Sequence, residues 1–489
     1  MPVSFPVQNV LLDRAAGENL DRQLYRQLRD LMERRVLPSG CALPSTRTLS
    51  KDLGIGRNTV IAAYEQLALE GFLKTGQGMR PLVRELPDYN LSPRSRTRDG
   101  RSGLSERGRS ISRQPFHHGR PGVTAFHPGL PDADNFPFNA WSKLLARRAR
   151  QARGDLFGTY HVTGYPPLCE ALARYLSASR GVVCRPEQIV VTNGAQSAFD
   201  LLARLLTDPD DAVWIEEPGY YGARAAFESA GAKLTSLRVD GRGWDFTPPS
   251  TLPRAIFVTP SCHHPLGVTM SVEQRLTLIG LAAEWQAWIV EDDYDSEYRF
   301  QGQPIPALQG LAPDARVVFV GTFAKILFPA MRLGYMVVPM DIRDSLTAAL
   351  SVTGQFAPLI TQAALADFIN QGFLTRHLRR MRRIYASRRE FFIDQFDHQL
   401  GRWMTLHKTD SGIQLAGIFR DAVDDRIIAG AAKARGVNVS PLSLQYRHRA
   451  PHQGLLMGFA AADDRTTQRS MQILAELLAE GIAGRQEPA

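Results

Sequence analysis

The residues with the clearest chemical potential lie in the stretch GTFAKILFPAMRLGYMVVP, Gly321 to Pro339. This stretch follows the apolar run 316–320 and places Lys325 in a short turn, with Arg332 further along. Upstream, the acidic segment 291–300 (EDDYDSEYRF) ends another apolar run. A lysine amine can trap a carbonyl as a Schiff base, an arginine can clamp a phosphate, and an aspartate can hold a protonated pyridine nitrogen. Together these residue types predict a pyridoxal phosphate (PLP) site with Lys325 as the Schiff-base lysine.

Such a site needs a scaffold that brings distant segments together, and the sequence after residue 123 predicts one. Short apolar runs alternate with helical stretches, as in QIVVTNG, DAVWIEE, AIFVTP, AWIVEDD and ARVVFVG. This alternation predicts an α/β fold with a mainly parallel sheet covered by helices, whose sites gather at the carboxyl ends of strands. The candidate site residues follow these runs. A helix that begins at Ala195 and Gln196 also offers backbone N–H groups to an anion.

The first 84 residues show a different pattern. The predicted elements are helices over 21–36, 45–53 and 57–70 and two short strands over 72–74 and 80–83. Ser45 is a good helix N-cap and Gly54 a good terminator. In the first helix the apolar residues Leu24, Leu28, Leu31, Met32 and Val36 recur at helical spacing. Helix, turn, helix and a two-stranded wing form a winged helix-turn-helix.

The segment LPSTRTLSKDLGIGRNTVIAAYEQLALEG, residues 43–71, closely resembles the DNA-binding domain of GntR-type regulators. The resemblance implies that Arg47 contacts phosphate or base at the start of its helix. It also implies that Arg57, Asn58 and Thr59 reach the major groove from the recognition helix. For Arg57 taken singly, an exposed helix-start arginine without a DNA role is the alternative. The partner implied is double-stranded operator DNA.

Residues 123–489 resemble fold-type I PLP enzymes of the class I aminotransferases, and the whole chain resembles the MocR/GabR subfamily of bacterial transcription regulators. The resemblance implies that Lys325 carries PLP and that six residues bind it: Ala195, Gln196, Tyr220, Asp292, Tyr294 and Arg332. In this assignment Asp292 pairs with the ring nitrogen, Tyr294 bonds the phenolic oxygen and Tyr220 stacks on the ring. The other three hold the phosphate. A homodimer is also implied, because fold-type I sites are built at a dimer interface.

The chain departs from the aminotransferase pattern at three places. The usual Asn-Pro-x-Gly is His264-Pro265-Leu266-Gly267, and the arginine that grips a substrate carboxylate is absent from Leu456-Met457-Gly458-Phe459. The tyrosine that a neighbouring subunit lends to the phosphate would align near Thr159, with Tyr160 one place off. A site that keeps the cofactor but loses the substrate clamp predicts a sensor with weak or absent turnover. Candidate replacement clamps for an effector are Arg224, Arg447 and Arg449.

The net charge of +9 is concentrated near the start of the chain. Residues 1–84 carry 12 Lys and Arg against 8 Asp and Glu, residues 85–125 carry 8 against 4, and the remainder is close to neutral. A basic head and tether suit a polyanion partner, although a solubilising surface is the alternative. The Ser/Arg/Gly-rich stretch predicts a flexible linker over 85–122, between a head over 1–84 and an effector domain over 123–489.

Other classes of protein are disfavoured. The sequence has no apolar run long enough to span a membrane and no secretory signal, so no membrane partner is expected. The four cysteines form no CxxC pair, so neither a disulfide framework nor a metal site is predicted. A cytoplasmic bacterial protein, associated with the nucleoid when bound to DNA, is expected.

Two functions stay open at this point. The first is a PLP-dependent, DNA-binding transcription regulator that senses a small amine, an amino acid or PLP itself. The second is an active aminotransferase with an accessory DNA-binding domain. A regulator that has lost PLP is disfavoured because Lys325, Asp292, Tyr294 and Arg332 are all present. The basic stretch 373–392 could be a second DNA contact, but we expect an amphipathic helix that joins subdomains.

Overall fold

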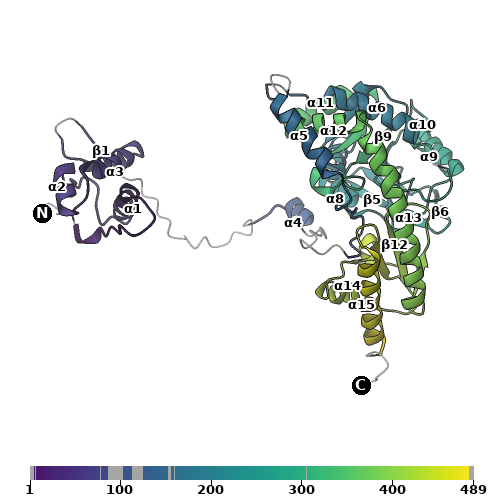
Figure 1. Cartoon of the computed structure of the whole chain (residues 1–489). Coiled ribbons are helices and arrows are strands. Elements are labelled where there is room, and N and C mark those ends of the chain that lie inside the picture. The colour runs from purple at the N-terminus through teal and green to yellow at the C-terminus, as the bar shows by residue number, and fades with distance from the viewer. Residues whose placement is uncertain are drawn as a thin grey trace. The chain divides into compact units, whose positions relative to one another are not determined.

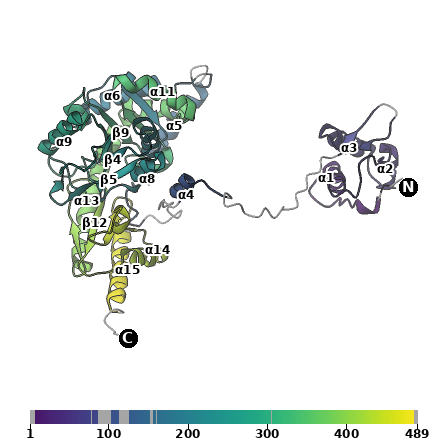
Figure 2. The ribbon, with the colours of Figure 1, turned by 180° about the vertical axis from the view of Figure 1, so that it is seen from behind.

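The structure is a computed structural model, and it falls into two parts that are described separately (Figures 1 and 2). It describes residues 5, 7–76, 79–85, 103–112, 125–151, 156–158, 160–303 and 305–483. The contacts divide the chain into residues 1–103, called the N-terminal unit here, and residues 104–489, called the large unit. The stretch expected to be a linker lies mostly outside the described residues. Within it, one short helix is described, α4 (Glu106–Ser112).

The N-terminal unit has the helices and the wing that the sequence pattern indicates. Its elements are η1 (Val7–Asn9), α1 (Leu20–Glu33), α2 (Thr46–Asp52), α3 (Arg57–Leu69), β1 (Leu73–Lys74) and β2 (Leu82–Val83). Ser45 caps α2, since its side chain accepts a hydrogen bond of 3.1 Å from the N–H of Thr48. The core is built where apolar residues of α1 and α3 meet, among them Leu24, Leu28, Val60 and Leu67. β1 and β2 pair antiparallel as the wing.

The first helix ends earlier than the apolar spacing predicts. α1 stops at Glu33, and Arg35 takes a left-handed backbone conformation with φ of 58°. The chain therefore turns away before Val36, which is 41% exposed, and Leu37 enters the core in its place. The expectation that Val36 completes the buried stripe is wrong, because the turn breaks the helical period on which it depended.

The large unit is built on an eight-stranded sheet with strand order β3-β10-β9-β8-β7-β4-β5-β6. Its strands are β3 (Ile189–Thr192), β4 (Ala212–Glu217), β5 (Lys233–Asp240), β6 (Gly243–Trp244), β7 (Ala255–Val258), β8 (Trp288–Asp293), β9 (Val317–Thr322) and β10 (Gly334–Val337). β10 runs antiparallel between β3 and β9, and β6 forms a short antiparallel pair with β5. The other neighbouring pairs are parallel. The prediction of a mainly parallel sheet in an α/β fold is confirmed.

Helices cover both faces of this sheet (Figure 1). One face packs against α7 (Ala195–Leu206), α8 (Tyr221–Ala230) and α11 (Met340–Thr353). The other packs against α6 (Pro166–Arg180), α9 (Val272–Glu284), α10 (Leu308–Leu311) and α12 (Leu359–Asn370), with α5 (Phe138–Gln151) lying on α12. Neighbouring residues of β8 face opposite layers, Val290 the first and Ile289 the second. Strands buried on both faces explain the continuous apolar runs of the sequence.

A smaller subdomain completes the large unit (Figure 2). Its sheet has strand order β11-β12-β14-β13. Its elements are α13 (Phe373–Gln399), β11 (Met404–His407), β12 (Gln414–Phe419), α14 (Asp425–Ala434), β13 (Ser440–Pro441), η4 (Leu442–Gln445), β14 (Gly454–Gly458) and α15 (Asp464–Ala483). The apolar stripe predicted for the basic helix α13 is buried at Leu374, Leu378, Met381 and Tyr385. No helix among the described residues is long and apolar enough to cross a membrane.

Candidate functional site

The sheet brings the predicted cofactor residues to one edge. Lys325 follows the carboxyl end of β9, and Asp292 lies at the carboxyl end of β8. Because β10 runs antiparallel between β3 and β9, its first residue, Gly334, pairs with the last residues of both neighbours. Arg332, directly after η3 (Pro329–Met331) and two residues before the start of β10, therefore lies near the start of α7, which carries Ala195. Strand direction places these segments together, as open α/β sheets generally do with their sites.

The side-chain amine of Lys325 lies at the centre of this edge. Its Nζ donates a hydrogen bond of 2.8 Å to the carbonyl of Gly129. Burial lowers the pKa of this amine, while Asp295 and Asp292 act in the opposite direction. A lysine that loses its proton more easily is a better nucleophile toward a carbonyl carbon. The environment of Lys325 therefore suits the Schiff-base role predicted for it.

Asp292 provides the second test of whether PLP fits. Its side chain is buried, and its Oδ1 has no hydrogen-bond partner within the described part of the chain. Burial raises the pKa of this carboxyl well above its usual range, and neighbouring acidic groups add to the effect. A buried, unsatisfied carboxyl is costly unless a donor meets it. The protonated nitrogen of a pyridine ring would supply that donor, so the observation fits PLP.

The neighbouring aspartate has a different role. Asp293 accepts a hydrogen bond of 2.7 Å from Nε of Arg180, and both side chains are buried. Arg180 also reaches the hydroxyl of Ser261. Asp293 is thus held by a structural ion pair under the site. Asp292 and Asp293 are adjacent residues of the same type, but their side chains point to opposite sides of β8. Asp293 pairs with Arg180, whereas Asp292 has no such partner among the described residues.

Tyr220 and Tyr294, both predicted to bind the cofactor, contact the ring of His264, which was not among the predicted cofactor residues. Tyr220, at the start of α8, meets the His264 ring edge-on at 5.6 Å between ring centroids. The ring of Tyr294 meets the same imidazole at 6.2 Å, and its hydroxyl contacts Cys262 Sγ at 3.7 Å. Burial raises the pKa of both phenols, so they are neutral hydrogen-bonding groups at physiological pH. Tyr220 and Tyr294 are thus both available to a ring bound over Asp292.

The start of α7 has the features of a phosphate cradle. Gly194, its N-cap, has φ of 95°, and a Cβ at Gly334 would lie 2.9 Å from the Cα of Gly194, so the backbones approach closely. The side-chain N–H of Gln196 donates a hydrogen bond of 2.8 Å to the carbonyl of Gly222. The side-chain oxygen of Gln196 is buried and has no hydrogen-bond partner among the described residues. Arg332 is exposed and forms no ion pair with any described residue. Backbone N–H groups and a free guanidinium together suit a bound phosphate.

Sequence reasoning missed two glutamines that hydrogen-bond His264. Nε2 of Gln414 donates to His264 Nδ1 at 3.1 Å, and His264 Nε2 donates to Oε1 of Gln445 at 3.1 Å. Burial lowers the pKa of His264 to about 4, so the ring is neutral at physiological pH. His264 was recognisable as a departure from Asn-Pro-x-Gly. Nothing in the sequence pointed to the glutamines, which lie 150 and 181 residues away from it in the chain.

The three candidate effector arginines have different surroundings in the structure. Arg224 donates to the carbonyl of Leu444 at 3.3 Å, and burial lowers its pKa. The guanidinium of Arg447 contacts the carbonyl of Leu234 in β5, and its backbone N–H donates a hydrogen bond of 2.8 Å to Oε1 of Glu217 at the carboxyl end of β4. Arg449 is exposed. Thr159 lies outside the described residues, and Tyr160 is 80% exposed with its ring 6.0 Å from that of Phe356.

The candidate DNA-contact residues lie at the starts of two helices. Arg47 is exposed on α2, and Arg57 and Asn58 are exposed at the first positions of α3, where Thr59 is half-buried. Nε of Arg57 lies 3.4 Å from the hydroxyl oxygen of Thr46, which links the two helix starts. The arrangement presents polar side chains at the amino end of the helix that follows the turn. This end of the recognition helix is the one that usually meets base edges.

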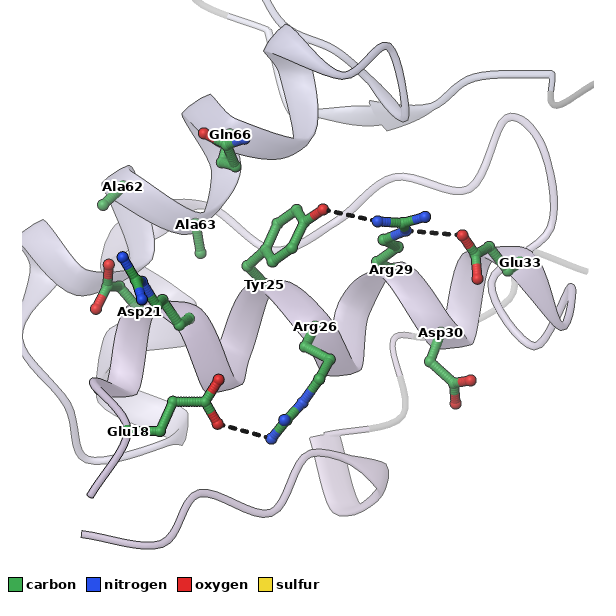
Figure 3. A pocket seen from close by; sticks show the side chains of 11 residues that line it. Glu18, Asp21, Tyr25, Arg26, Arg29, Asp30, Glu33, Ala62, Ala63 and Gln66 are labelled. Carbon is green, nitrogen blue, oxygen red and sulfur yellow. Dashed lines mark hydrogen bonds and ion pairs between the residues drawn. The ribbon is translucent and has the colours of Figure 1, made fainter. Parts of the chain in front are cut away.

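A groove of about 770 Å³ lies between α1 and α3 of the N-terminal unit (Figure 3). Its walls carry charges that are already paired: Arg26 with Glu18 at 2.8 Å, and Arg29 with Glu33 at 2.7 Å. With four acidic and three basic residues lining it, the groove has no excess positive charge to attract a phosphate. It also contains none of the predicted DNA-contact residues. We interpret it as a solvated surface of the helix pair and place the functional site of this unit at the helix starts.

Comparisons with known proteins agree with both halves of this description. Residues 20–83 match the family "Bacterial regulatory proteins, gntR family", and residues 128–450 match "Aminotransferase class I and II". The chain is 47% identical to the "Probable rhizopine catabolism regulatory protein MocR" of Rhizobium meliloti, over 95% of each chain. It is 32% identical to the "HTH-type pyridoxine biosynthesis transcriptional regulator PdxR" of Corynebacterium glutamicum, over 94% of this chain and 95% of that one.

The large unit also resembles solved aminotransferase structures. The α-aminoadipate aminotransferase LysN from Thermus thermophilus, solved with a phosphopyridoxyl-leucine adduct, superimposes with a TM-score of 0.70. The match covers 77% of this chain and 98% of LysN at 23% identity, so it speaks for the fold. The cofactor implied by the aminotransferase family is PLP. Full-length similarity to named regulators, with a GntR domain before an aminotransferase domain, shows that the chain belongs to the MocR-type subfamily of GntR-family transcription regulators.

Proposed function

We propose that the large unit is a PLP-dependent sensor, in which an amine effector bound beside Lys325 changes how the N-terminal unit binds operator DNA. Lys325 would hold PLP covalently, Asp292 would pair with its ring nitrogen, and Tyr294 and Tyr220 would contact its ring. The phosphate would lie on Ala195, Gln196 and Arg332. Bound PLP supplies an electrophilic aldehyde carbon, the atom at which amines exchange.

One observation favours a sensor over an enzyme. The position where an aminotransferase carries its carboxylate-binding arginine is Leu456, which is 1% exposed in β14 and packs against Ala416 and Leu442. A core leucine cannot orient a substrate carboxylate, and orientation is a large part of the rate of such enzymes. The residues suited to the cofactor are present, whereas the substrate clamp is replaced by packing. Binding without rapid turnover follows from that combination.

The test measures cofactor state and DNA binding on the same sample. The PLP-loaded chain is titrated with amines while its visible absorbance is recorded, together with its affinity for DNA from the intergenic region beside its own gene. We expect an amine that shifts the absorbance to change DNA affinity by about 5- to 150-fold, the usual range of coupling between two sites. DNA affinity that stays constant while the absorbance shifts would contradict the sensor proposal.

An active aminotransferase is the second candidate, favoured by the lowered pKa of Lys325. A lysine that can take and return a proton could serve as a general base. The two candidates separate when the loaded protein is mixed with amino acids and a keto acid and the product is followed. Turnover of about 1–1000 per second would promote the enzyme, and weak or absent product would favour the sensor.

The placement of the recognition helix leads to a prediction for Arg57→Ala. An arginine bonded to a guanine edge contributes about 1–3 kcal/mol of discrimination, so specific operator affinity should fall by that amount. The loss should be much smaller for unrelated DNA, and PLP absorbance should not change. Arg34→Ala is the matched control, because Arg34 is exposed and pairs with Asp30 at the far end of α1. Wild-type operator binding by Arg57→Ala would place the recognition surface elsewhere.

The contact between Gly129 and Lys325 leads to a prediction for Gly129→Ala. Gly129 has φ of +65°, and a Cβ there would lie 2.2 Å from Nζ of Lys325, far inside van der Waals contact. The amine must therefore move, and we expect the fraction of protein that borohydride fixes to PLP to fall sharply. Gly436→Ala is the control, because Gly436 also has positive φ (+85°) but no atom within 4 Å of the added Cβ. Equal loss in both variants would mean that backbone strain alone is responsible.

We also propose that the protein is a homodimer that binds DNA at the nucleoid. The fold-type I resemblance implies a partner at the phosphate side of the site. Large apolar side chains are exposed in this region at Phe157, Tyr160 and Val352, by 65%, 80% and 88%. Exposed apolar groups of this size are typical of an interaction surface. Light scattering should give twice the mass of 54.3 kDa, and a monomer at micromolar concentration would contradict the proposal.

A further inference from the structure

A neutral side chain lies beside Lys325 that the cofactor assignment does not use. Oε1 of Gln414 is 3.6 Å from the point where a Cβ on Gly129 would lie, and Nζ of Lys325 is 2.2 Å from that same point. The amide oxygen and the amine therefore both lie close to Gly129, at Lys325's end of the site. Within the described part of the chain, no hydrogen bond reaches this oxygen, since the only side-chain bond of Gln414 runs from Nε2 to His264. The oxygen is available to a ligand attached at Lys325's end of the site.

His264 holds the glutamine in this orientation. A neutral imidazole has one N–H donor and one acceptor nitrogen. Its Nε2 donates to Gln445 at 3.1 Å, which leaves Nδ1 to accept from Gln414 at 3.1 Å. Burial and the nearby charge of Lys325 both lower the pKa of His264, so protonation does not disturb the chain of bonds at physiological pH. The wall made of Gln414, His264 and Gln445 is therefore polar and without charge.

The acidic groups near Lys325 are Asp295 and Asp292, and both act on the pKa of its amine. Burial raises the pKa of both carboxyls, that of Asp295 to about 7, so they do not form a strongly negative wall. A bound pyridine ring would pair with Asp292, but Asp295 would remain as a buried acidic group. An effector carboxylate would gain no cation from Leu456, which packs in the core, or from Arg224, whose guanidinium lies on the carbonyl of Leu444. An unpaired carboxylate in such a place is strongly disfavoured.

We propose that the effector is an amine that carries hydroxyl groups, and no carboxylate, next to its amino carbon, and that Gln414 recognises one of those hydroxyls. A hydroxyl both donates and accepts, so it satisfies a neutral amide in either orientation. This inference rests on the proposed function, because it concerns the effector of the same site.

The test uses matched amines on the PLP-loaded full-length chain. The probes are 2-amino-1,3-propanediol against serine, 2-aminoethanol against glycine, and 2-aminopropane as an amine with neither group. Half-saturation is read from the visible absorbance and, independently, from the shift in melting temperature. We expect each amino alcohol to half-saturate the protein at a concentration at least about tenfold below that of its amino acid, as the absence of a charge-assisted partner for the carboxylate requires.

The role of Gln414 is tested by Gln414→Met, which keeps the length of the side chain and removes its hydrogen-bonding groups. The preference for 2-amino-1,3-propanediol over 2-aminopropane should fall about two- to tenfold, the value of one neutral hydrogen bond. A ratio taken within each protein cancels any general weakening of the site. The absorbance of the variant before amine is added shows whether PLP is still held. His264→Asn, which restores the aminotransferase residue, should reduce the same ratio because Gln414 then loses its orienting partner.

The outcomes separate the inference from the function on which it rests. If the wild-type chain never binds PLP covalently, the proposed function fails. If PLP binds but serine or glycine binds as tightly as its amino alcohol, the effector class is wrong while the PLP sensor stands. The effector class is also wrong if no probe changes the absorbance. An unchanged ratio in a PLP-loaded Gln414→Met would remove Gln414 as the residue that recognises the hydroxyl.

Discussion

Replacing Lys325 by alanine is expected to abolish covalent binding of PLP and with it the visible absorbance of the protein. The sequence has seven lysines, and Lys325 is the one whose amine lies at the strand ends beside Asp292. Removing it leaves no amine near enough to the cofactor carbon to replace it. The measurement is borohydride reduction followed by mass spectrometry of peptides. In the wild type we expect a single phosphopyridoxyl adduct, on Lys325.

Two control variants make this result specific. Lys325→Arg keeps the positive charge but cannot form the bond, so it should behave like Lys325→Ala if chemistry rather than charge matters. Lys408→Ala should retain full absorbance, because Lys408 is an exposed residue that pairs with Asp397 at 2.7 Å. Wild-type absorbance in Lys325→Ala, or an adduct on another lysine of the wild type, would overturn the cofactor assignment.

Replacing Arg180 by methionine is expected to lower the free energy of unfolding of the large unit by about 3–5 kcal/mol. Arg180 and Asp293 are 5% and 3% exposed at their side chains and lie 2.7 Å apart. Removing one partner of a buried ion pair leaves the other as an uncompensated buried charge, which is where a cost of this size comes from. The six tryptophans lie in residues 141–403, so urea unfolding followed by tryptophan fluorescence reports on the large unit alone.

The same helix offers a control. Arg174→Met removes an exposed arginine of α6 that contacts only the side chain of Asn370 among the described residues, and it should change the free energy by less than about 1 kcal/mol. Adding Asp293→Asn to Arg180→Met should recover part of the loss, because the stranded charge is then removed. Equal stability of Arg180→Met and wild type would show that the pair contributes nothing net.

Several features of the chain could be predicted because they depend on local sequence. The start of α2 follows from the capping side chain of Ser45, and the end of α2 from Gly54, whose φ is positive. The parallel sheet follows from continuous apolar runs, which only strands buried on both faces require. Local patterns carry such information because hydrogen bonds within a turn or cap connect residues only a few positions apart. Where the local pattern misled, at Val36, a single left-handed residue had broken the period.

Some features of the site follow from the sequence, and others follow only from the tertiary structure. The sequence by itself determined the family and the cofactor, and it predicts the lysine, because a motif around one residue is contiguous in the chain. The resemblance had already assigned Asp292 to the cofactor, but only the tertiary structure decided that Asp293 pairs with Arg180, since neighbouring strand residues point to opposite sides. It also brought Gln414 and Gln445 to His264. Residues so far apart in sequence carry no mutual signal, because their contact is produced by the packing of one subdomain on another.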